Sequence, residues 1–231
     1  KHIKTLKTVL NIAVDKEVSN NIDFRHKNFK VLKEEVDSIY LNEVELRAML
    51  DIDLSKSPRL ENARDLFIIG AYTGLRVSDF NNLKKENILV ERGVRMFKVF
   101  TTKTQKFIGV PIHKIVNEIL NKYNGGLPPK MPEQKINESI KEVGFNAGID
   151  RKIIVHSGSR KKENGGAIYK YQLIQSHTAR RSFATNAFLA GISSLEIMRI
   201  TGHTTESNFL KYIKATPEEV AIKMSEHSFF K

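Results

Sequence analysis

The stretch HTARRSFATNAFLAGISSLEIMRITGHTTESNFLKY, residues 177–212, contains short helical segments that are separated by turn residues. His177 and Arg180 are three residues apart, so on a helix their side chains project from the same side. Apolar residues within 183–188 can turn toward a core, and Gly191 is expected to end this helix as its C′ residue. The pattern therefore predicts an imidazole and a guanidinium side by side on a core-facing helix.

A second and a third helix are predicted later in the same stretch. Ser193 and Glu196 have the spacing of a capping box, which predicts a helix that ends just before His203. Tyr212 lies nine residues after His203, on a further predicted helix over residues 206–214. A cation, two imidazoles and a phenol that meet near helix ends would form a site for an anion that is attacked by a weak nucleophile.

Two upstream segments complete a pattern with this stretch. They are AYTGLRVSDFNNLKKENI, residues 71–88, and TTKTQKFIGVPI, residues 101–112. Together, the three segments resemble the arginine box, the β-hairpin lysine segment and the C-terminal boxes of tyrosine recombinase catalytic domains, the phage integrase family. The resemblance spans about residues 40–215 and fills all six positions of that family's site: Arg76, Lys103, His177, Arg180, His203 and Tyr212.

The resemblance implies a fold and an activity. The expected fold is mainly α with a small antiparallel β-sheet, that is, the α+β fold of a tyrosine recombinase catalytic domain. The expected activity is DNA strand cleavage and rejoining in the site-specific recombination or integration of a phage or mobile element. In that chemistry Tyr212 would attack phosphorus to form a 3′-phosphotyrosyl bond, and Lys103 would protonate the leaving 5′ oxygen. His177 would act as base or hydrogen-bond the phosphate, and His203 would hold a phosphate oxygen.

The residue types suit these implied roles. Arg76 and Arg180 carry planar, permanently charged guanidinium groups that can bind phosphate oxygens in a bidentate manner. A tyrosine hydroxyl, with an ordinary pKa of about 10, becomes a useful nucleophile when cations and a nearby base favour its phenolate. The scheme requires no metal ion and no cofactor, and the sequence has no GxxxxGK[ST] phosphate loop.

Composition and net charge indicate which classes of partner the protein can bind. The 231 residues are 40% hydrophobic, enough to bury a full core, and the net charge of +12 points to a polyanion. Nucleic acid is the first such partner and an acidic membrane surface the second, while a merely soluble basic protein is the alternative on charge alone. The chain has no cysteine, which fits a reducing cytoplasm, and no apolar run approaches the ~18 residues of a membrane span. We expect a cytoplasmic, nucleoid-associated protein.

The N-terminal region differs from the rest. Residues 1 to about 20 predict a basic amphipathic helix, and the segment that follows lacks apolar periodicity. In the family such a helix is the last of a separate core-binding domain. The implied division is therefore 1–30, the end of a core-binding domain with its linker, and 31–231, the catalytic domain with a C-terminal helix. The alternative is a helix that simply packs on the main domain.

Local signals place the remaining elements. Asn42 with Glu45 and Ser57 with Pro58 each predict a helix start. Further helices are expected over residues 113–124, 133–149 and 220–227. Alternation of apolar and polar residues over 94–112 predicts a β-hairpin with Lys103 near its tip. Lys106 is close by and is the alternative candidate for the family's lysine position. The loop with residues 160–162 is either a phosphate contact or a solvated tip.

Three functions remain open at this point. The first is a tyrosine recombinase or integrase that acts on double-stranded DNA, by family analogy as a tetramer on paired sites with accessory DNA-bending proteins as candidate partners. The second is a type IB topoisomerase-like enzyme, which shares the nucleophile but only relaxes DNA. The third is a non-catalytic DNA-binding relative, against which the six filled positions argue.

Overall fold

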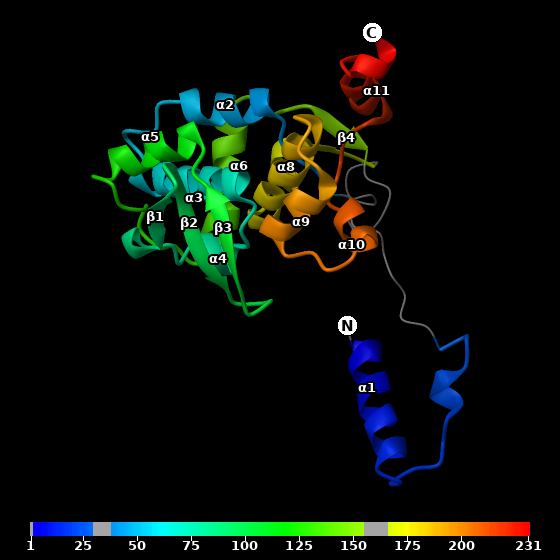
Figure 1. The fold of residues 1–231 in the computed structure, drawn as a ribbon. Helices are drawn as coiled ribbons and strands as arrows, with labels where there is room; N and C mark the ends of the chain where they lie inside the picture. Colours follow the sequence, from blue (N-terminus) through cyan, green and yellow to red (C-terminus); the bar gives the residue numbers. More distant parts are fainter. Residues whose placement is uncertain (1, 30–37, 155–165) are drawn as a thin grey trace.

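The domain is organised around a helix that is buried on nearly all sides. The computed structural model describes residues 2–29, 38–154 and 166–231. Helix α3 (Pro58–Thr73) is buried at every residue from Ala63 to Thr73, as expected of a helix that crosses the middle of a core. Figure 1 shows α8 (Ser176–Leu189) and α6 (Glu133–Asn146) beside it. The mainly helical fold predicted from the sequence is confirmed.

Short helices cover this centre. They are α2 (Glu43–Asp51), α4 (Val77–Phe80) and α5 (Lys114–Lys122), together with 3-10 turns η2 (Lys85–Asn87) and η3 (Lys170–Leu173). The capping box between Asn42 and Glu45 is present, as predicted. Ser57 does precede α3, but its side chain makes no capping hydrogen bond, so Pro58 alone gives the expected start signal.

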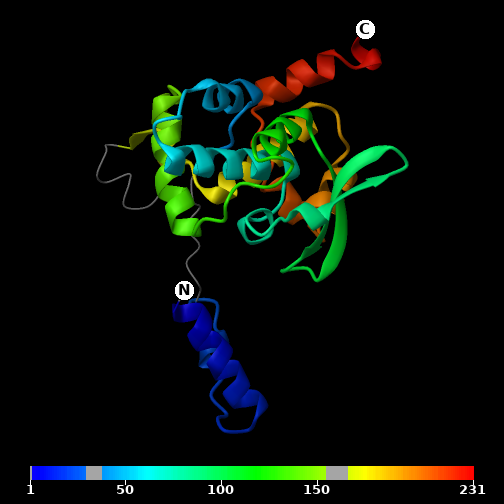
Figure 2. The same ribbon diagram turned by 90° about the vertical axis from the view of Figure 1, so that its left-hand side faces the viewer.

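A three-stranded antiparallel sheet lies against one side of the helices (Figures 1 and 2). Its strands are β1 (Ile88–Glu91), β2 (Val94–Thr101) and β3 (Lys106–Pro111), in that order. The hairpin predicted over 94–112 is therefore confirmed, and β1 is an addition. Arg92 and Gly93 join β1 to β2 with φ of +50° and +80°, a tight turn in which an arginine occupies a position that usually favours asparagine or glycine. This atypical turn residue explains why the sequence pattern missed β1.

A second, smaller core lies under the C-terminal helices α9 (Ser194–Thr201) and α10 (Glu206–Leu210). Its buried members are Ala184, Ala187, Ile197 and Phe209. The predicted capping box at the start of α9 is present, and Gly191 has φ +92°, as expected of the residue after a helix end. The helix predicted over 206–214 is wrong in length, because α10 ends at Leu210.

The remaining elements flank this body. The strands β4 (Lys152–Ile154) and β5 (Ala167–Tyr169) pair antiparallel, and the chain ends with α11 (Pro217–Ser225) and η4 (Ser228–Phe230). At the other end, α1 (His2–Asp15) is shorter than the helix predicted over 1–20, and η1 (Asp23–Arg25) follows it. No residue of α1 is buried. The predicted domain boundary at residue 30 and the loop with residues 160–162 lie outside the described residues.

Candidate active site

Helix α8 carries two of the six predicted residues, and α6 fixes its start. Ser176 donates its backbone N–H to Asn137 Oδ1 at 2.7 Å and its hydroxyl to Glu133 Oε1 at 2.6 Å. One turn of helix then separates the half-buried His177 from Arg180, which is 2% exposed. The two side chains are therefore presented from one anchored helix turn.

Arg180 spans two helix ends. Its Nη1 donates to the backbone oxygen of Gly74 at 2.6 Å, and its Nη2 donates to the backbone oxygen of Thr201. Its Nε is buried without a hydrogen-bond partner among the described residues. Burial, followed by the charge of Arg76, lowers the pKa of Arg180 to about 10. The group therefore stays charged at neutral pH and has donor capacity left for an anion.

Arg76 lies where the chain leaves α3. Gly74 ends that helix with φ +65°, and a Cβ there would come within 2.3 Å of an aromatic ring of α8, so this turn requires glycine. Arg76 is the N-cap residue of α4, and no hydrogen bond or ion pair holds its guanidinium within the described part of the chain. Two residues earlier, the backbone oxygen of Gly74 accepts a hydrogen bond from Arg180. The positive charge of Arg76 lowers the pKa of three other site residues: His177, Arg180 and His203.

Tyr212 closes the cluster from the turn after α10. Its hydroxyl lies 2.7 Å from His177 Nε2, and its ring centroid lies 4.4 Å from that of His203. The guanidinium carbon of Arg180 is 5.8 Å from the tyrosine ring centroid. The backbone oxygen of Tyr212 accepts a 3.3 Å hydrogen bond from the hydroxyl of Thr185 on α8. The tyrosine is thus tied to the helix that carries its partners.

The two histidines are neutral at pH 7. For His177, burial and then the charges of Arg181 and Arg180 lower the pKa to about 4. For His203, burial and then the charges of Arg180 and Arg76 also lower the pKa to about 4. A neutral imidazole has one nitrogen without a proton, so His177 Nε2 can accept the proton of the tyrosine hydroxyl.

Lys103 lies in the turn between β2 and β3. Its neighbour Thr102 donates both its backbone N–H and its hydroxyl to Asp79 Oδ1, at 3.2 and 3.1 Å, which ties the start of this turn to α4. The Lys103 side chain is exposed. Lys103 and His203 line one groove, and the charge of Lys103 contributes to the low pKa of both site histidines. The structure therefore places all six predicted residues around one point.

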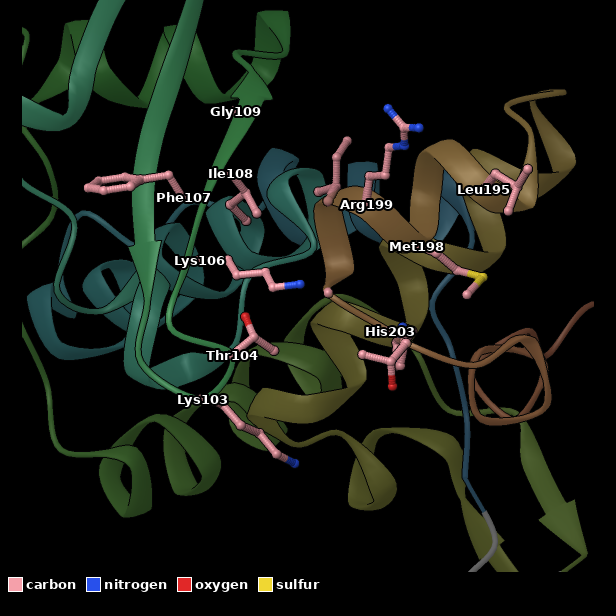
Figure 3. Close-up of a pocket in the computed structure, with 13 residues that line it drawn as sticks. Lys103, Thr104, Lys106, Phe107, Ile108, Gly109, Leu195, Met198, Arg199 and His203 are labelled. Carbon is pink, nitrogen blue, oxygen red and sulfur yellow. The ribbon is translucent and has the colours of Figure 1, made fainter.

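A groove opens beside this point, between β3 and α9. It has a volume of about 1010 Å³, and its lining includes Lys103, Lys106, Met198 and His203. In Figure 3, the side chains of Lys103 and Lys106 extend from the hairpin toward the side on which His203 lies. A groove with lysines on one wall and apolar side chains in its lining can take an anionic chain that runs past the cluster.

Two residues near the site were not predicted to act there. The Oδ1 of Asp79 holds the hairpin turn, and its Oδ2 is buried without a hydrogen-bond partner among the described residues. The hydroxyl of Thr201, at the end of α9, lies 2.8 Å from His203 Nδ1. Nothing in the spacing of the sequence signals either contact, because each depends on how distant elements or a helix end are placed.

The fold and the cluster define a class: a mainly helical domain with a tyrosine, two arginines, two histidines and a lysine at one cationic site. The sequence model of the phage integrase family matches residues 39–219. The chain belongs to the phage integrase family.

The solved structures of similar fold are named as integrases and recombinases. A lambda integrase (residues 75–356) dimer bound to a COC′ core site has a TM-score of 0.66 and 17% identity, covering 91% of this chain and 70% of that one. XerA recombinase has a TM-score of 0.59 and 19% identity, covering 98% and 74%. XerH recombinase, bound to a palindromic difH substrate, has a TM-score of 0.55 and 18% identity. At these identities the likeness shows the fold.

The match with XerH covers 81% of this chain and 52% of the XerH chain, so this chain spans about half of the length of XerH. Comparison with curated proteins found no match.

Within the described residues, no group of three or more histidine, cysteine or acidic side chains is placed to hold a metal ion. In the same part of the chain, no helix is long and apolar enough to cross a membrane.

Proposed function

We propose that this chain is the catalytic part of a site-specific tyrosine recombinase that cleaves and rejoins double-stranded DNA, for a phage or another mobile element. The observation that carries the proposal is the 2.7 Å contact between the Tyr212 hydroxyl and His177 Nε2, beside the buried charge of Arg180. A nucleophile, its base and a fixed cation are the minimum that attack on a phosphodiester requires. Family membership supports the same activity.

In the proposed reaction, the same residues serve strand cleavage and its reversal, strand joining. The hydroxyl proton of Tyr212 passes to His177 Nε2 as the phenolic oxygen attacks phosphorus. Arg76 and Arg180 bind the non-bridging oxygens, on which negative charge increases in the transition state. The P–O5′ bond breaks, Lys103 protonates the leaving 5′ oxygen, and a 3′-phosphotyrosyl bond remains. Attack by a 5′ hydroxyl reverses these steps and joins the strand to the same or a new partner.

The charge distribution supports DNA as the substrate. The net charge of +12 favours a polyanion, and the groove beside the cluster has lysines on the hairpin wall. The solved lambda integrase and XerH structures are named as complexes with DNA sites. We extend the proposal to a tetramer on paired recombination sites, with accessory DNA-bending proteins as partners. We also propose a cytoplasmic, nucleoid-associated location.

Covalent trapping tests the activity. The protein would be incubated with nicked duplexes cut from the DNA that flanks its coding sequence, quenched in detergent, and compared with Tyr212→Phe. We expect a detergent-stable adduct with the wild type. For the variant we expect adduct formation at least ~10⁴-fold slower, because the attacking oxygen is missing. DNA retention at low salt should be equal for both proteins. An equal adduct yield from the variant would contradict the assignment of Tyr212.

Product analysis in the same reaction separates the alternatives. Joining of strands from two different duplexes supports a recombinase, whereas relaxation of a supercoiled plasmid without exchange supports the topoisomerase-like reading. Tight, salt-sensitive binding of DNA without any adduct would support a non-catalytic DNA-binding relative.

A further inference from the structure

The hydroxyl of Thr201 occupies an unusual place beside the site. Thr201 is the last residue of α9 and is 1% exposed. Its Oγ1 lies 2.8 Å from the backbone oxygen of Ile197 and 2.8 Å from His203 Nδ1. The two partners differ in kind: a carbonyl oxygen can only accept a hydrogen bond, whereas an imidazole nitrogen can donate or accept one.

One proton has to serve these two contacts. A threonine hydroxyl carries a single hydrogen, and because the Ile197 carbonyl oxygen can only accept, its 2.8 Å contact with Oγ1 is a hydrogen bond only if that hydrogen points to it. The lone pairs of Oγ1 then face His203, and Nδ1 completes the contact only by donating its own N–H. In a neutral imidazole with the proton on Nδ1, Nε2 is the nitrogen without a proton.

The surroundings of Nε2 fit this assignment. His203 Nε2 is buried and has no hydrogen-bond partner among the described residues. The charged and titratable groups around the ring are cations, one phenol and one neutral histidine: Arg76, Lys103, His177, Arg180 and Tyr212. A bare nitrogen among cations is accommodated more easily than a protonated one, and an arriving phosphate would change that balance by adding negative charge.

We propose that Thr201 is a positioning residue that holds His203 as the Nδ1–H tautomer, so that Nε2 faces the reaction site as the nitrogen that takes up a proton when a phosphoryl oxygen binds. The proton comes from solvent as the DNA is bound, and the protonated Nε2 then donates to the phosphoryl oxygen. This inference rests on the proposed recombinase function for the identity of the anion, while the tautomer itself is a property of the free protein.

The backbone around the pair restricts other arrangements. The N–H of His203 donates to the backbone oxygen of Met198 at 3.2 Å, and Gly202 between the two residues adopts the left-handed conformation that ends α9. The backbone oxygen of Thr201 also accepts from Arg180 Nη2. Thr201 therefore links the buried arginine through its backbone and the histidine through its side chain.

Nitrogen-15 spectra of the histidine side chains in the free protein test the tautomer directly. The His203→Gln variant identifies the signals of His203 by their loss. We expect a protonated Nδ1 and an unprotonated Nε2 at pH 7 in the wild type. A protonated Nε2 with a bare Nδ1 would overturn the proposal. This measurement needs no variant to fold apart from the one that assigns the signals.

A matched pair of variants tests the consequence for catalysis. Thr201→Val keeps the shape but removes the hydroxyl, and Thr201→Ser keeps the hydroxyl. We expect Thr201→Val to form the covalent DNA adduct roughly tenfold more slowly, which is the order of effect seen when a histidine in a metal site loses the hydrogen-bond partner that orients its ring. We also expect this variant to show mixed His203 tautomers. Thr201→Ser should restore both the rate and the spectrum.

The outcomes separate this inference from the proposed function. If the wild type forms the adduct and Thr201→Val is equally fast with an unchanged tautomer, the positioning role is wrong. If the wild type forms no adduct, the recombinase proposal fails, and the spectra of the wild type still decide the tautomer. Equal slowing of the valine and serine variants would indicate a packing role for the threonine methyl group instead.

Discussion

The two halves of the candidate site differ in how they are held. The helical half comprises His177, Arg180, His203 and Tyr212, whose side chains contact one another or the backbone ends of α3 and α9. The open half comprises Arg76 and Lys103. Neither has a side-chain hydrogen bond or ion pair to the described residues.

The difference matches the roles proposed for the residues of the two halves. The nucleophile Tyr212 and its base His177 need a fixed distance, because a displacement of about 1 Å can cost ~10²-fold in rate. Arg76 and Lys103 act on phosphate and leaving-group oxygens that only the DNA brings, so their contacts can form when the DNA arrives. We infer that the helical half is assembled within one chain before DNA binds, and that the open half is completed by the DNA.

The rate of adduct formation should separate the two hairpin lysines. Lys103→Ala should slow covalent adduct formation by about 10²-fold, because the leaving 5′ oxygen loses its proton donor. Lys106→Ala is the matched control and should change the rate little, although its side chain faces the same groove. Rates on nicked duplexes and retention of DNA at several salt concentrations would be measured for both.

The result also decides whether Lys103 acts in cleavage or only in DNA binding. If Lys103→Ala lost DNA binding and cleavage to the same extent, Lys103 would be a docking contact. If Lys106→Ala were the slower variant, the lysine assigned to the leaving oxygen would have to be exchanged.

A comparison of stability tests whether the protein holds Arg180 more firmly than Arg76. Lysine at position 180 has one ammonium and cannot span the carbonyl oxygens of Gly74 and Thr201, so Arg180→Lys should lower the free energy of unfolding by about 2 kcal/mol. Arg76→Lys should change it by less than about 0.5 kcal/mol, because no hydrogen bond of the described protein is lost. Urea unfolding of the two variants measures both values, and equal losses would erase the distinction between the halves.

The stability of the protein is also expected to depend on pH. The folded-state pKa of His177 and of His203 is about 4, below the ordinary 6.5 of an unfolded histidine. As pH falls below about 6.5, the unfolded chain therefore binds protons first, and stability falls until about pH 4. Because both side chains are partly exposed, we expect a loss of about 1 kcal/mol for each histidine.

Substitution checks the source of this slope. His177→Gln should remove about half of the decline in the urea midpoint between pH 6.5 and 4.5 and leave the part due to His203, whereas Lys106→Ala should leave the whole decline in place, because Lys106 does not contribute to the low pKa of either histidine. An unchanged slope in His177→Gln would mean that this histidine titrates normally in the folded protein.

The sequence was sufficient for the parts of this site that rest on local spacing. The three-residue step from His177 to Arg180 and the capping box at Ser193 both predict what the structure contains. Family resemblance supplied the order of the six residues, and their gathering around one point is a structural finding.

Other features could not be predicted because they depend on contacts between distant elements. Tyr212 lies in a turn after α10, held by a hydrogen bond from Thr185 to its backbone, and not on the helix that its surroundings in the sequence favour. The hold of Asp79 on the hairpin turn joins residues 23 positions apart. Helix propensity and periodicity carry no signal for either.

A complementation assay tests most directly whether one chain assembles its own helical half. Arg76→Ala keeps its tyrosine but lacks an arginine that binds the phosphate, and Tyr212→Phe lacks the nucleophile in an otherwise intact site. Each variant alone, and an equal mixture of the two, would be incubated with nicked duplex and assayed for the detergent-stable adduct. Because Tyr212 contacts His177 of its own chain, we predict that the mixture forms no more adduct than the Arg76→Ala protein alone. Adduct from the mixture at a rate near that of the wild type would mean that the tyrosine acts in a neighbouring subunit, and would contradict the assembly described here.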